Sequence, residues 1–452
     1  MKLVYNVNDK PKFGSVIVFA LQQLLAILAA TIAVPAIVGN GMSQSAALFG
    51  AGVGTIVYQL FTKFRSPVFL GSSFAFLPSM FAAFAGAATA AGGYAGLLIG
   101  AGFAGLVYVV IAIVVKFAGV KWIDKLMPPV VIGPTVALIG LSLAGNAIKD
   151  AVGGSAANAT VYDAANSVWI MAPSGWICLV CALVTLAGVM ISSVYGKKML
   201  KMIPFIIGIV AGYAVAAIFT VIGISTGNPD LQVVNFSLFN NMQWLPDFTF
   251  LKAFEGFGAV DGKYIATLAV AYVPVAFVVF AEHLADHKNI SSIIEKDLLK
   301  DPGLHRTLLG DGVGSIAGAF FGGCPNTTYG ESIGCVAISG NASVVTITTT
   351  ACIAIVAAFI APFTTLLATI PSCVMGGVCI ALYGFIAVSG LKMIQKVDLN
   401  DNHNLFVVST ILVAGVGGMA LKIGEVTITA IACALILGIL ANLLLSGKKN
   451  DK

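Results

Sequence analysis

The chain has 452 residues, of which 59% are hydrophobic and only 10% are charged. A soluble protein of this length cannot hide so much apolar surface in one core, so the composition excludes a soluble class and indicates a polytopic membrane protein embedded in a lipid bilayer. The net charge of +5 says little by itself, and nucleic acid is not expected as a partner.

Apolar segments follow one another along the whole chain, and we interpret them as fourteen transmembrane segments of an all-α membrane protein. The 50 glycines fit closely packed membrane helices, where small residues let backbones approach. The segments lie at about 15–38, 44–62, 68–87, 93–115, 128–148, 173–195, 202–224, 264–285, 308–322, 328–340, 343–368, 373–391, 404–421 and 426–446.

The distribution of Lys and Arg predicts the orientation in the membrane. If the N-terminus, the even-numbered connections and the C-terminus share one side, that side holds 20 of the 24 basic residues. The other side holds only Lys149, Lys252, Lys263 and Lys422. The positive-inside rule then places both termini in the cytoplasm, and an error of one segment would destroy this alternation.

A polar connection at 225–263, expected to be extracytoplasmic, separates seven segments from seven. An odd number in each half requires the second half to be inverted relative to the first, as in secondary transporters. In both halves the third segment begins with a stretch rich in Gly, Pro and hydroxyl residues, at 65–78 and at 324–331. We expect two short extended strands there, in segments 3 and 10, next to a substrate site at the membrane midplane. Wide surface loops are the alternative interpretation.

Glu282 and Asp286 are the strongest candidates for chemistry within the membrane. They lie one helical turn apart, and so on one helix face, at the end of an apolar run that begins near Ile265. A charge at the centre of a bilayer costs roughly 2.5–3.5 kcal/mol even on lenient insertion scales. Two close carboxyls also repel when both are ionised, so we expect at least one to bind a proton readily and to serve in proton coupling. The alternatives for Glu282 are a structural ion pair and a carboxyl near the cytoplasmic interface.

The second break adds further candidate ligands. Gly330 has no side chain to cover its backbone N–H, and Glu331 follows it in the expected first turn of a helix. In the opposite break, Phe74 can stack on a flat ring or pack in the core. Carboxylate acceptors, backbone donors and an aromatic face together match a planar heterocycle with ring N–H and carbonyl groups better than a sugar or an inorganic ion.

Other polar residues have simpler interpretations. His283 and His287 are spaced like metal ligands, but the order E-H-x-x-x-H differs from the metalloprotease order and no third ligand is evident. No metal or cofactor is therefore expected, and His287 is expected to be solvated. Asp311 is expected to cap or anchor a loop. Cys178 and Cys181 are read as small buried hydrophobic residues rather than a disulfide or metal pair.

Several motifs resemble the nucleobase–ascorbate transporter (nucleobase/cation symporter) family, its bacterial uracil-permease branch in particular. The similar stretches are 71–76 (GSSFAF), 281–283 (AEH), 296–306 (KDLLKDPGLHR) and 326–331 (NTTYGE), with further similarity at 21–35 and 127–133. The resemblance covers about residues 13 to 446.

This resemblance implies proton-coupled uptake of a nucleobase through the bacterial cytoplasmic (inner) membrane, by a protein that is not an enzyme and is usually a homodimer. The implied domains are a core domain at 13–118 and 264–368, a gate domain at 119–224 and 369–446, and the linker at 225–263. The implied binding residues are Glu282 and Glu331, which hydrogen-bond the base, the backbone at Phe74 and Gly330, which binds its carbonyls, and Ala30, Phe74 and Tyr329, which form walls.

Two positions depart from the uracil-type pattern. Asp286 stands where uracil-type members often have His, and Ser332 replaces a frequent Asn, whereas Glu331 is typical of uracil-type members. Uracil is therefore the first expectation and xanthine or another oxopurine the second. An inorganic anion carrier shares the seven-plus-seven architecture, and a membrane enzyme using Glu282 and His283 is the other rival.

Overall fold

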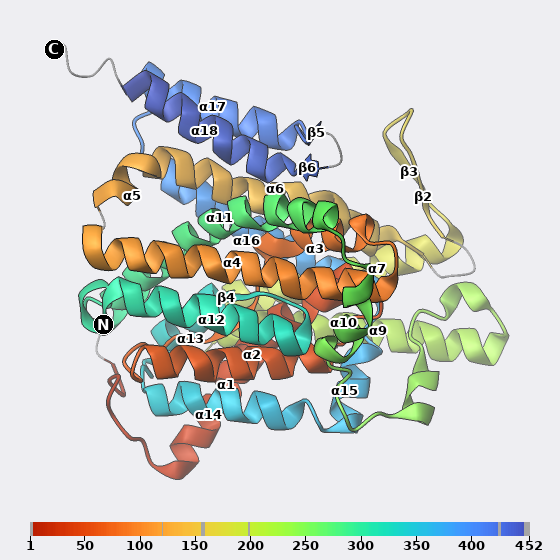
Figure 1. Ribbon diagram of the computed structural model, residues 1–452. Coiled ribbons are helices and arrows are strands. Elements are labelled where there is room, and N and C mark those ends of the chain that lie inside the picture. The colour runs from red at the N-terminus through yellow and green to blue at the C-terminus, as the bar shows by residue number, and fades with distance from the viewer. Residues whose placement is uncertain (1–2, 120, 155–158, 198, 424–425, 447–452) are drawn as a thin grey trace.

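The computed structural model describes residues 3–119, 121–154, 159–197, 199–423 and 426–446, and its helices run roughly parallel to one another in one body (Figure 1). The first half contains α1 (Phe13–Val38), α2 (Gln44–Phe61), α3 (Leu77–Gly86), α4 (Ala90–Ala118), α5 (Lys121–Leu126), α6 (Pro129–Val152), α7 (Pro173–Tyr195), α8 (Met199–Met202) and α9 (Pro204–Thr226). The second half contains α11 (Gly262–Ile294), α12 (Leu304–Gly322), α13 (Gly330–Ser339), α14 (Val344–Ala357), α15 (Ala361–Ala368), α16 (Ser372–Ile394), α17 (Asn402–Val416) and α18 (Ala430–Ser446).

The strands are short and pair two by two. The pairs are β1 (Leu70–Ser72) with β4 (Asn326–Thr328), β2 (Val161–Asp163) with β3 (Val168–Ile170), and β5 (Leu421–Ile423) with β6 (Val426–Ile428), all antiparallel. Single turns complete the fold: η1 (Phe74–Phe76), η2 (Pro229–Leu231), η3 (Phe236–Asn241), η4 (Phe257–Ala259) and the π-helical η5 (Leu299–Gly303).

Each of the fourteen predicted segments coincides with a helix or with a broken unit, which confirms the polytopic all-α fold. Among the described residues, seven helices are individually long and apolar enough to cross a membrane, and α14 with α15 forms an eighth candidate bent by 85°. The helices of segments 3 and 10 are too short to cross a membrane, because the strands β1 and β4 occupy the first residues of these segments. The predicted strands in these two segments are therefore confirmed.

Glycine contacts bring α2 and α12 together in the interior. A Cβ added to Gly50 would meet the carbonyl oxygen of Gly318 at 2.5 Å, and one added to Gly314 would meet that of Gly54 at 2.7 Å. The side chain of Asn326, in β4, lies against Gly54 and Gly318 and donates from Nδ2 to the carbonyl of Gly50 at 3.1 Å. This close approach is the usual means by which membrane helices gain packing energy.

The connection between the halves folds onto the core through phenylalanines. It contains α10 (Thr249–Gly256), which packs against α4. Phe248 makes edge contacts with Phe49 and Phe321, at 5.0 and 5.6 Å between ring centroids, and Phe250 stacks on Phe320 at 4.8 Å. These aromatic contacts attach the connection to the ends of α2 and α12.

Lys252 of α10 completes this attachment. Its Nζ lies 2.5 Å from Asp247 Oδ2, donates to the carbonyl of Gly41 at 3.1 Å, and lies 4.8 Å from the ring centroid of Tyr94. Partial burial acts to lower the pKa of Lys252, but its interactions with Asp247 and Tyr94 outweigh burial and the net shift is upward. The side chain therefore stays charged and holds α10 beside α4.

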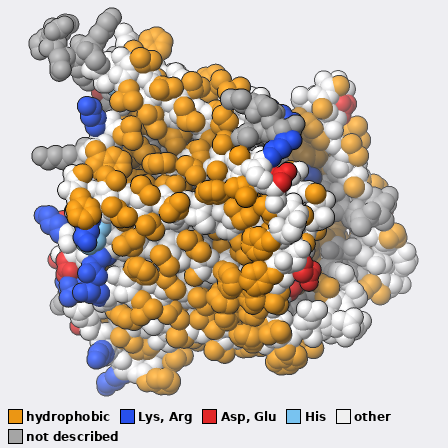
Figure 2. All heavy atoms as spheres, in the orientation of Figure 1, with side chains coloured by type: hydrophobic (Ala, Val, Ile, Leu, Met, Phe, Trp, Pro, Cys, Tyr) orange, Lys and Arg blue, Asp and Glu red, His pale blue; other side chains and the backbone are white. Residues whose placement is uncertain are grey.

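The surface shows how the protein sits in a bilayer (Figure 2). Hydrophobic side chains cover the middle of the visible face, whereas Lys and Arg gather mainly along its left edge. The first described residues and the end of α18 also lie on the left in Figure 1. The chain is thus a multi-pass membrane protein whose basic residues concentrate at one end.

Candidate functional site

A cavity of about 370 Å³ lies where the two broken segments meet. One wall is built by η1, α11, β4 and α13, through Phe74, Ala75, Glu282, Ala285, Asp286, Thr327, Thr328, Tyr329, Gly330 and Glu331. The facing wall comes from α6, α9 and α16, through Val136, Ile139, Phe205, Leu382, Phe385, Ile386, Ser389 and Met393. The volume and the mixture of apolar walls with a few polar groups are those of a small-molecule site.

The strand pair β1–β4 forms the floor that positions these groups. Leu70 pairs with Thr328, and Ser72 with Asn326. Two further hydrogen bonds extend the ladder, from Tyr329 N to the Phe69 carbonyl at 3.2 Å and from Ser73 N to the Pro325 carbonyl at 2.9 Å. The strands satisfy each other's backbone groups, which is why non-helical chain is tolerated at this depth.

Helices begin directly after both strands and present their N-terminal ends at the cavity. The turn η1 leads into α3, and α13 begins at Gly330. A Cβ added to Gly330 would meet no atom within 4 Å, so the backbone there borders open space. The unpaired N–H groups of a first helical turn can bind a carbonyl oxygen or an anion.

The structure brings the three predicted carboxyls to the same cavity. Glu282 and Asp286 come from α11, and Glu331 comes from the first turn of α13. Thr328 Oγ1 donates a hydrogen bond to Asp286 Oδ2 at 2.6 Å, which fixes Asp286 to strand β4. Three carboxyls from two separate helices of the second half, α11 and α13, thus converge on one space.

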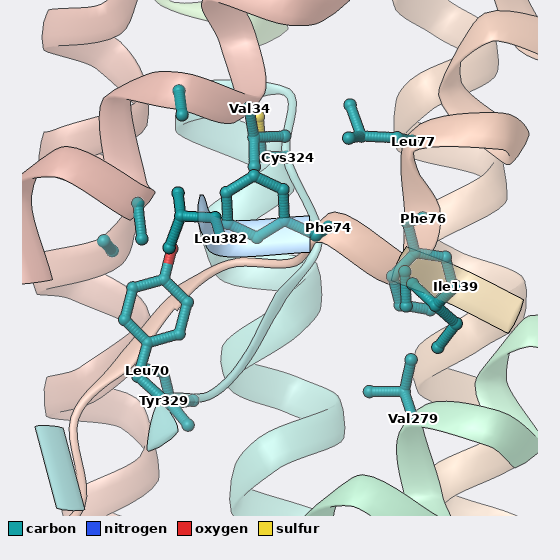
Figure 3. Close-up of a cluster of buried hydrophobic side chains, with 14 of the residues drawn as sticks. Val34, Leu70, Phe74, Phe76, Leu77, Ile139, Val279, Cys324, Tyr329 and Leu382 are labelled. Carbon is teal, nitrogen blue, oxygen red and sulfur yellow. The ribbon is translucent and has the colours of Figure 1, made fainter. Parts of the chain in front are cut away.

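Phe74 and Tyr329 are the aromatic residues of the broken segments that line this space, together with Leu382 of α16. Figure 3 shows the three side chains close to one another. Phe74 meets Tyr383 of α16 edge-on, with ring centroids 5.9 Å apart. The Tyr329 hydroxyl donates to the Ser72 carbonyl at 2.8 Å, which fixes its ring against β1. Ala30 is buried in α1 and does not line the cavity, whereas Ala26, one turn earlier, does.

Two expectations about polar residues are wrong. His287 is fully buried rather than solvated, because α2 and α12 cover this side of α11. Asp311 neither caps nor anchors a loop, since it lies inside α12 at 1% exposure with Oδ2 2.6 Å from His283 Nδ1. Polar groups at membrane depth pair with one another, and that rule applied to His283, His287 and Asp311 would have found the cluster.

The facing wall was missed by sequence reasoning because its members are ordinary apolar residues. Val136, Ile139, Phe205 and Phe385 carry no feature that separates them from lipid-facing side chains. Ser389 is the polar exception. Only the fold brings α6, α9 and α16 against the broken segments, so spacing along the chain holds no signal for them.

Comparisons with known proteins agree with this arrangement. Residues 14–424 match the family model of the Permease family. The uracil permease of Bacillus caldolyticus is 40% identical over 99% of this chain and 96% of its own length. The uracil permeases of Bacillus subtilis and Escherichia coli K12 are 37% and 34% identical, over 100% and 96% of this chain and 97% and 92% of their own lengths.

Solved structures with the same fold are more distant in sequence. The transmembrane domain of the cyanobacterial bicarbonate transporter BicA superposes with a TM-score of 0.65 at 16% identity, covering 97% of this chain and 100% of that domain. The murine anion transporter Slc26a9 in its inward-facing state gives a TM-score of 0.64 at 13% identity, covering 98% of this chain and 70% of that protein. These likenesses establish the shared inverted-repeat fold and nothing about the substrate.

Proposed function

The chain belongs to the nucleobase–ascorbate transporter family, and on that premise we propose that it imports uracil across the bacterial cytoplasmic membrane together with protons. As a member of this family it is a nucleobase transporter rather than an enzyme. The identity of the base, the coupling ion and the orientation are the proposed parts.

The main support for the proposal is that hydrogen-bond acceptors, hydrogen-bond donors and an aromatic ring lie together in one small cavity. Carboxyls at Glu282 and Glu331 can accept hydrogen bonds from the ring N–H groups of a base. Backbone N–H groups at the starts of η1 and α13 can donate to its carbonyl oxygens, and Phe74 can cover one face of the ring. A planar base with alternating N–H and C=O groups uses every one of these features.

Uracil is preferred over xanthine for two reasons. The two relatives at 40% and 37% identity, which cover 99% and 100% of this chain, are named uracil permeases. Glu331 is also typical of uracil-type sites, although Asp286 replaces the His found in many of them. Xanthine or another oxopurine is the second candidate, because Asp at this position is common in the purine-transporting branch.

The proposed orientation places both termini and the cavity mouth in the cytoplasm. The cavity extends to Lys201, Met202 and Pro204, in the connection between α7 and α9, which the Lys and Arg count assigns to the cytoplasm. Lys and Arg also gather at the end of the molecule where the described chain begins and ends (Figure 2). The structure would then correspond to an inward-open state.

Transport would follow from relative movement of two domains. We assign residues 13–118 and 264–368 to a mobile core and 119–224 and 369–446 to a gate, usually within a homodimer. The cavity lies between groups from both proposed domains, so sliding one past the other would expose it to either side. Glu282 and Asp286 are the proposed coupling residues, because a bound proton would let the site close over a neutral base.

Ligand binding to the purified protein tests the substrate. We expect uracil to raise the thermal unfolding temperature, and Glu331→Gln to lose that response because an acceptor for the ring N–H becomes an amide. Glu255→Gln, in the connection between the halves, is the matched control and should respond like the wild type. Stabilisation by xanthine alone would move the protein to the purine branch, and no response to either base would refute nucleobase binding.

Uptake into proteoliposomes tests the coupling. We expect labelled uracil to accumulate unchanged when a proton gradient is imposed and not when an ionophore dissipates it. Asp286→Asn should abolish accumulation while leaving exchange of bound base intact. Full proton-driven accumulation by Asp286→Asn would exclude Asp286 from coupling.

A further inference from the structure

The side of α11 next to its two carboxyls carries a buried polar cluster with no place in the proposed binding site. His283 and His287 follow Glu282 and Asp286 by one position each and also lie one turn apart. Both histidines have 0% exposure, and neither lines the cavity. The helix therefore has an acidic stripe facing the cavity and a histidine stripe facing the protein interior.

Two other elements, α12 and α2, hold the histidine stripe. His283 Nδ1 lies 2.6 Å from Asp311 Oδ2, and His283 Nε2 lies 3.0 Å from Thr307 Oγ1, both on α12. His287 Nδ1 donates to the His283 carbonyl at 2.8 Å, which leaves Nε2 to meet the Tyr58 hydroxyl of α2 at 2.7 Å. The two imidazole rings stack with centroids 3.9 Å apart.

The pair of His283 and Asp311 differs from an ordinary surface ion pair. Its side chains are 0% and 1% exposed, and Asp311 Oδ1 has no hydrogen-bond partner among the described residues. An isolated charge buried in this way is costly, so the two groups share one proton and the pair is neutral as a unit. Removing His283 leaves Asp311 without the base that shares its proton, so at alkaline pH Asp311 ionises alone on the interior side of α11.

We propose that Asp311, acting through His283, is a positioning residue for the carboxyls of Glu282 and Asp286. The contact fixes the rotation of α11, so the acidic stripe points into the cavity, and the neutrality of the pair sets the electric field in which those carboxyls bind protons. This inference rests on the proposed function, in which uptake requires protonation of the acidic stripe.

The cluster lies among several other groups that can titrate. Tyr58 from α2 and Tyr108 from α4 pack against the histidines, and Glu331 lines the same cavity wall as Glu282 and Asp286. Among these groups the His283–Asp311 contact is the fully buried pair of acid and base. A change of charge at this pair therefore acts on the carboxyls of α11 in addition to the charge of Glu331.

The test is the pH dependence of nucleobase uptake into proteoliposomes by two single variants. His283→Asn keeps an N–H donor but removes the base that takes the proton of Asp311, so that Asp311 ionises alone at alkaline pH. A negative charge favours the protonated carboxyls, so the alkaline limb of uptake should move up by about one pH unit. Asp311→Asn leaves a buried histidine with no anionic partner, which is neutral at alkaline pH like the original pair, so the limb should stay in place.

A shift in His283→Asn alone distinguishes positioning by charge from a merely structural role, since both variants break the same contact and a loss of packing would affect them alike. Asp301→Asn is the control, because it breaks the exposed Arg65–Asp301 pair of the same 2.6 Å length and should leave the midpoint unchanged. A His283→Asn midpoint that stays at the wild-type value, or an equal shift in both variants, would overturn the inference.

The double variant His283→Asn with Asp311→Asn keeps the test decisive if a single variant fails to fold. Two amides form a neutral hydrogen-bonded pair, so its midpoint should return to the wild-type value. A double variant that folds and remains shifted would contradict the charge argument. Wild-type protein that shows no pH-dependent uptake would instead refute the proposed function, which separates the two failures.

Discussion

Gly330 shows how one missing side chain can serve binding at the expense of stability. It begins α13 on the cavity wall, and a Cβ added there would meet nothing within 4 Å. We predict that Gly330→Ala raises the free energy of unfolding by about 0.4–1 kcal/mol, because it reduces the freedom of the unfolded chain. The same methyl group enters the cavity, so uracil affinity should fall about tenfold when measured by calorimetry.

Gly102→Ala is the matched control for that prediction, since Gly102 on α4 also has no atom within 4 Å of the added Cβ but lies away from the cavity. It should gain stability without losing affinity. Equal affinities of Gly330→Ala and the wild type would show that the base does not approach this backbone.

At the scale of elements, the packing of α2 on α12 depends on glycines that have no space beside them for a side chain. Gly50→Ala would place a methyl group 2.5 Å from the Gly318 carbonyl, so the two backbones would have to separate. We predict a loss of about 1–3 kcal/mol in stability, seen as a lower thermal unfolding temperature. Gly145→Ala, on an open face of α6, should keep or raise that temperature; similar values for the two variants would contradict the close packing.

The elements that the sequence predicts are those with a hydropathy signal. Long apolar runs give the positions of α1, α4 and α11, and clusters of Gly, Pro and Ser give the breaks at β1 and β4. The hairpin of β2 and β3 was missed because three-residue strands are too short to show alternation. The 85° bend between α14 and α15 was missed because both pieces are apolar.

The candidate site likewise contains residues that the sequence predicts and residues that only the structure reveals. Glu282, Asp286 and Glu331 are visible in the sequence because charge is costly in a membrane, and the structure brings all three to one cavity. The pairing of His283 with Asp311 depends on how α11 and α12 are rotated about their axes, which spacing along the chain does not determine. His287 was misplaced because its neighbour Lys288 resembles the start of a solvated loop.

At the scale of the whole molecule, the fold is shared with anion transporters while the cavity chemistry differs. An inorganic anion carrier is expected to present bare helix N-termini or cations to its substrate. Here the N-terminal end of α13 is accompanied by three carboxyls. The likeness to BicA therefore extends to the architecture, and the nucleobase relatives account better for the site.

Orientation and access can be tested together through Cys335, which lines the cavity one turn after Glu331. We predict that a charged, membrane-impermeant thiol reagent modifies Cys335 from the cytoplasmic side, and that uracil slows the reaction. Inside-out and right-side-out vesicles compared by mass spectrometry provide the measurement, and Cys335→Ser is the control. Modification only from the external side would reverse the proposed orientation.

The β1–β4 ladder has a consequence for how the gene can be divided. Each half of the chain supplies one strand, and three residue pairs from Leu70–Thr328 to Ser72–Asn326 join them. Neither half can build the floor of the cavity alone, because its strand would have no partner for its backbone groups. Two fragments separated within 225–263 should thus be inactive singly and complement each other when produced in the same cell.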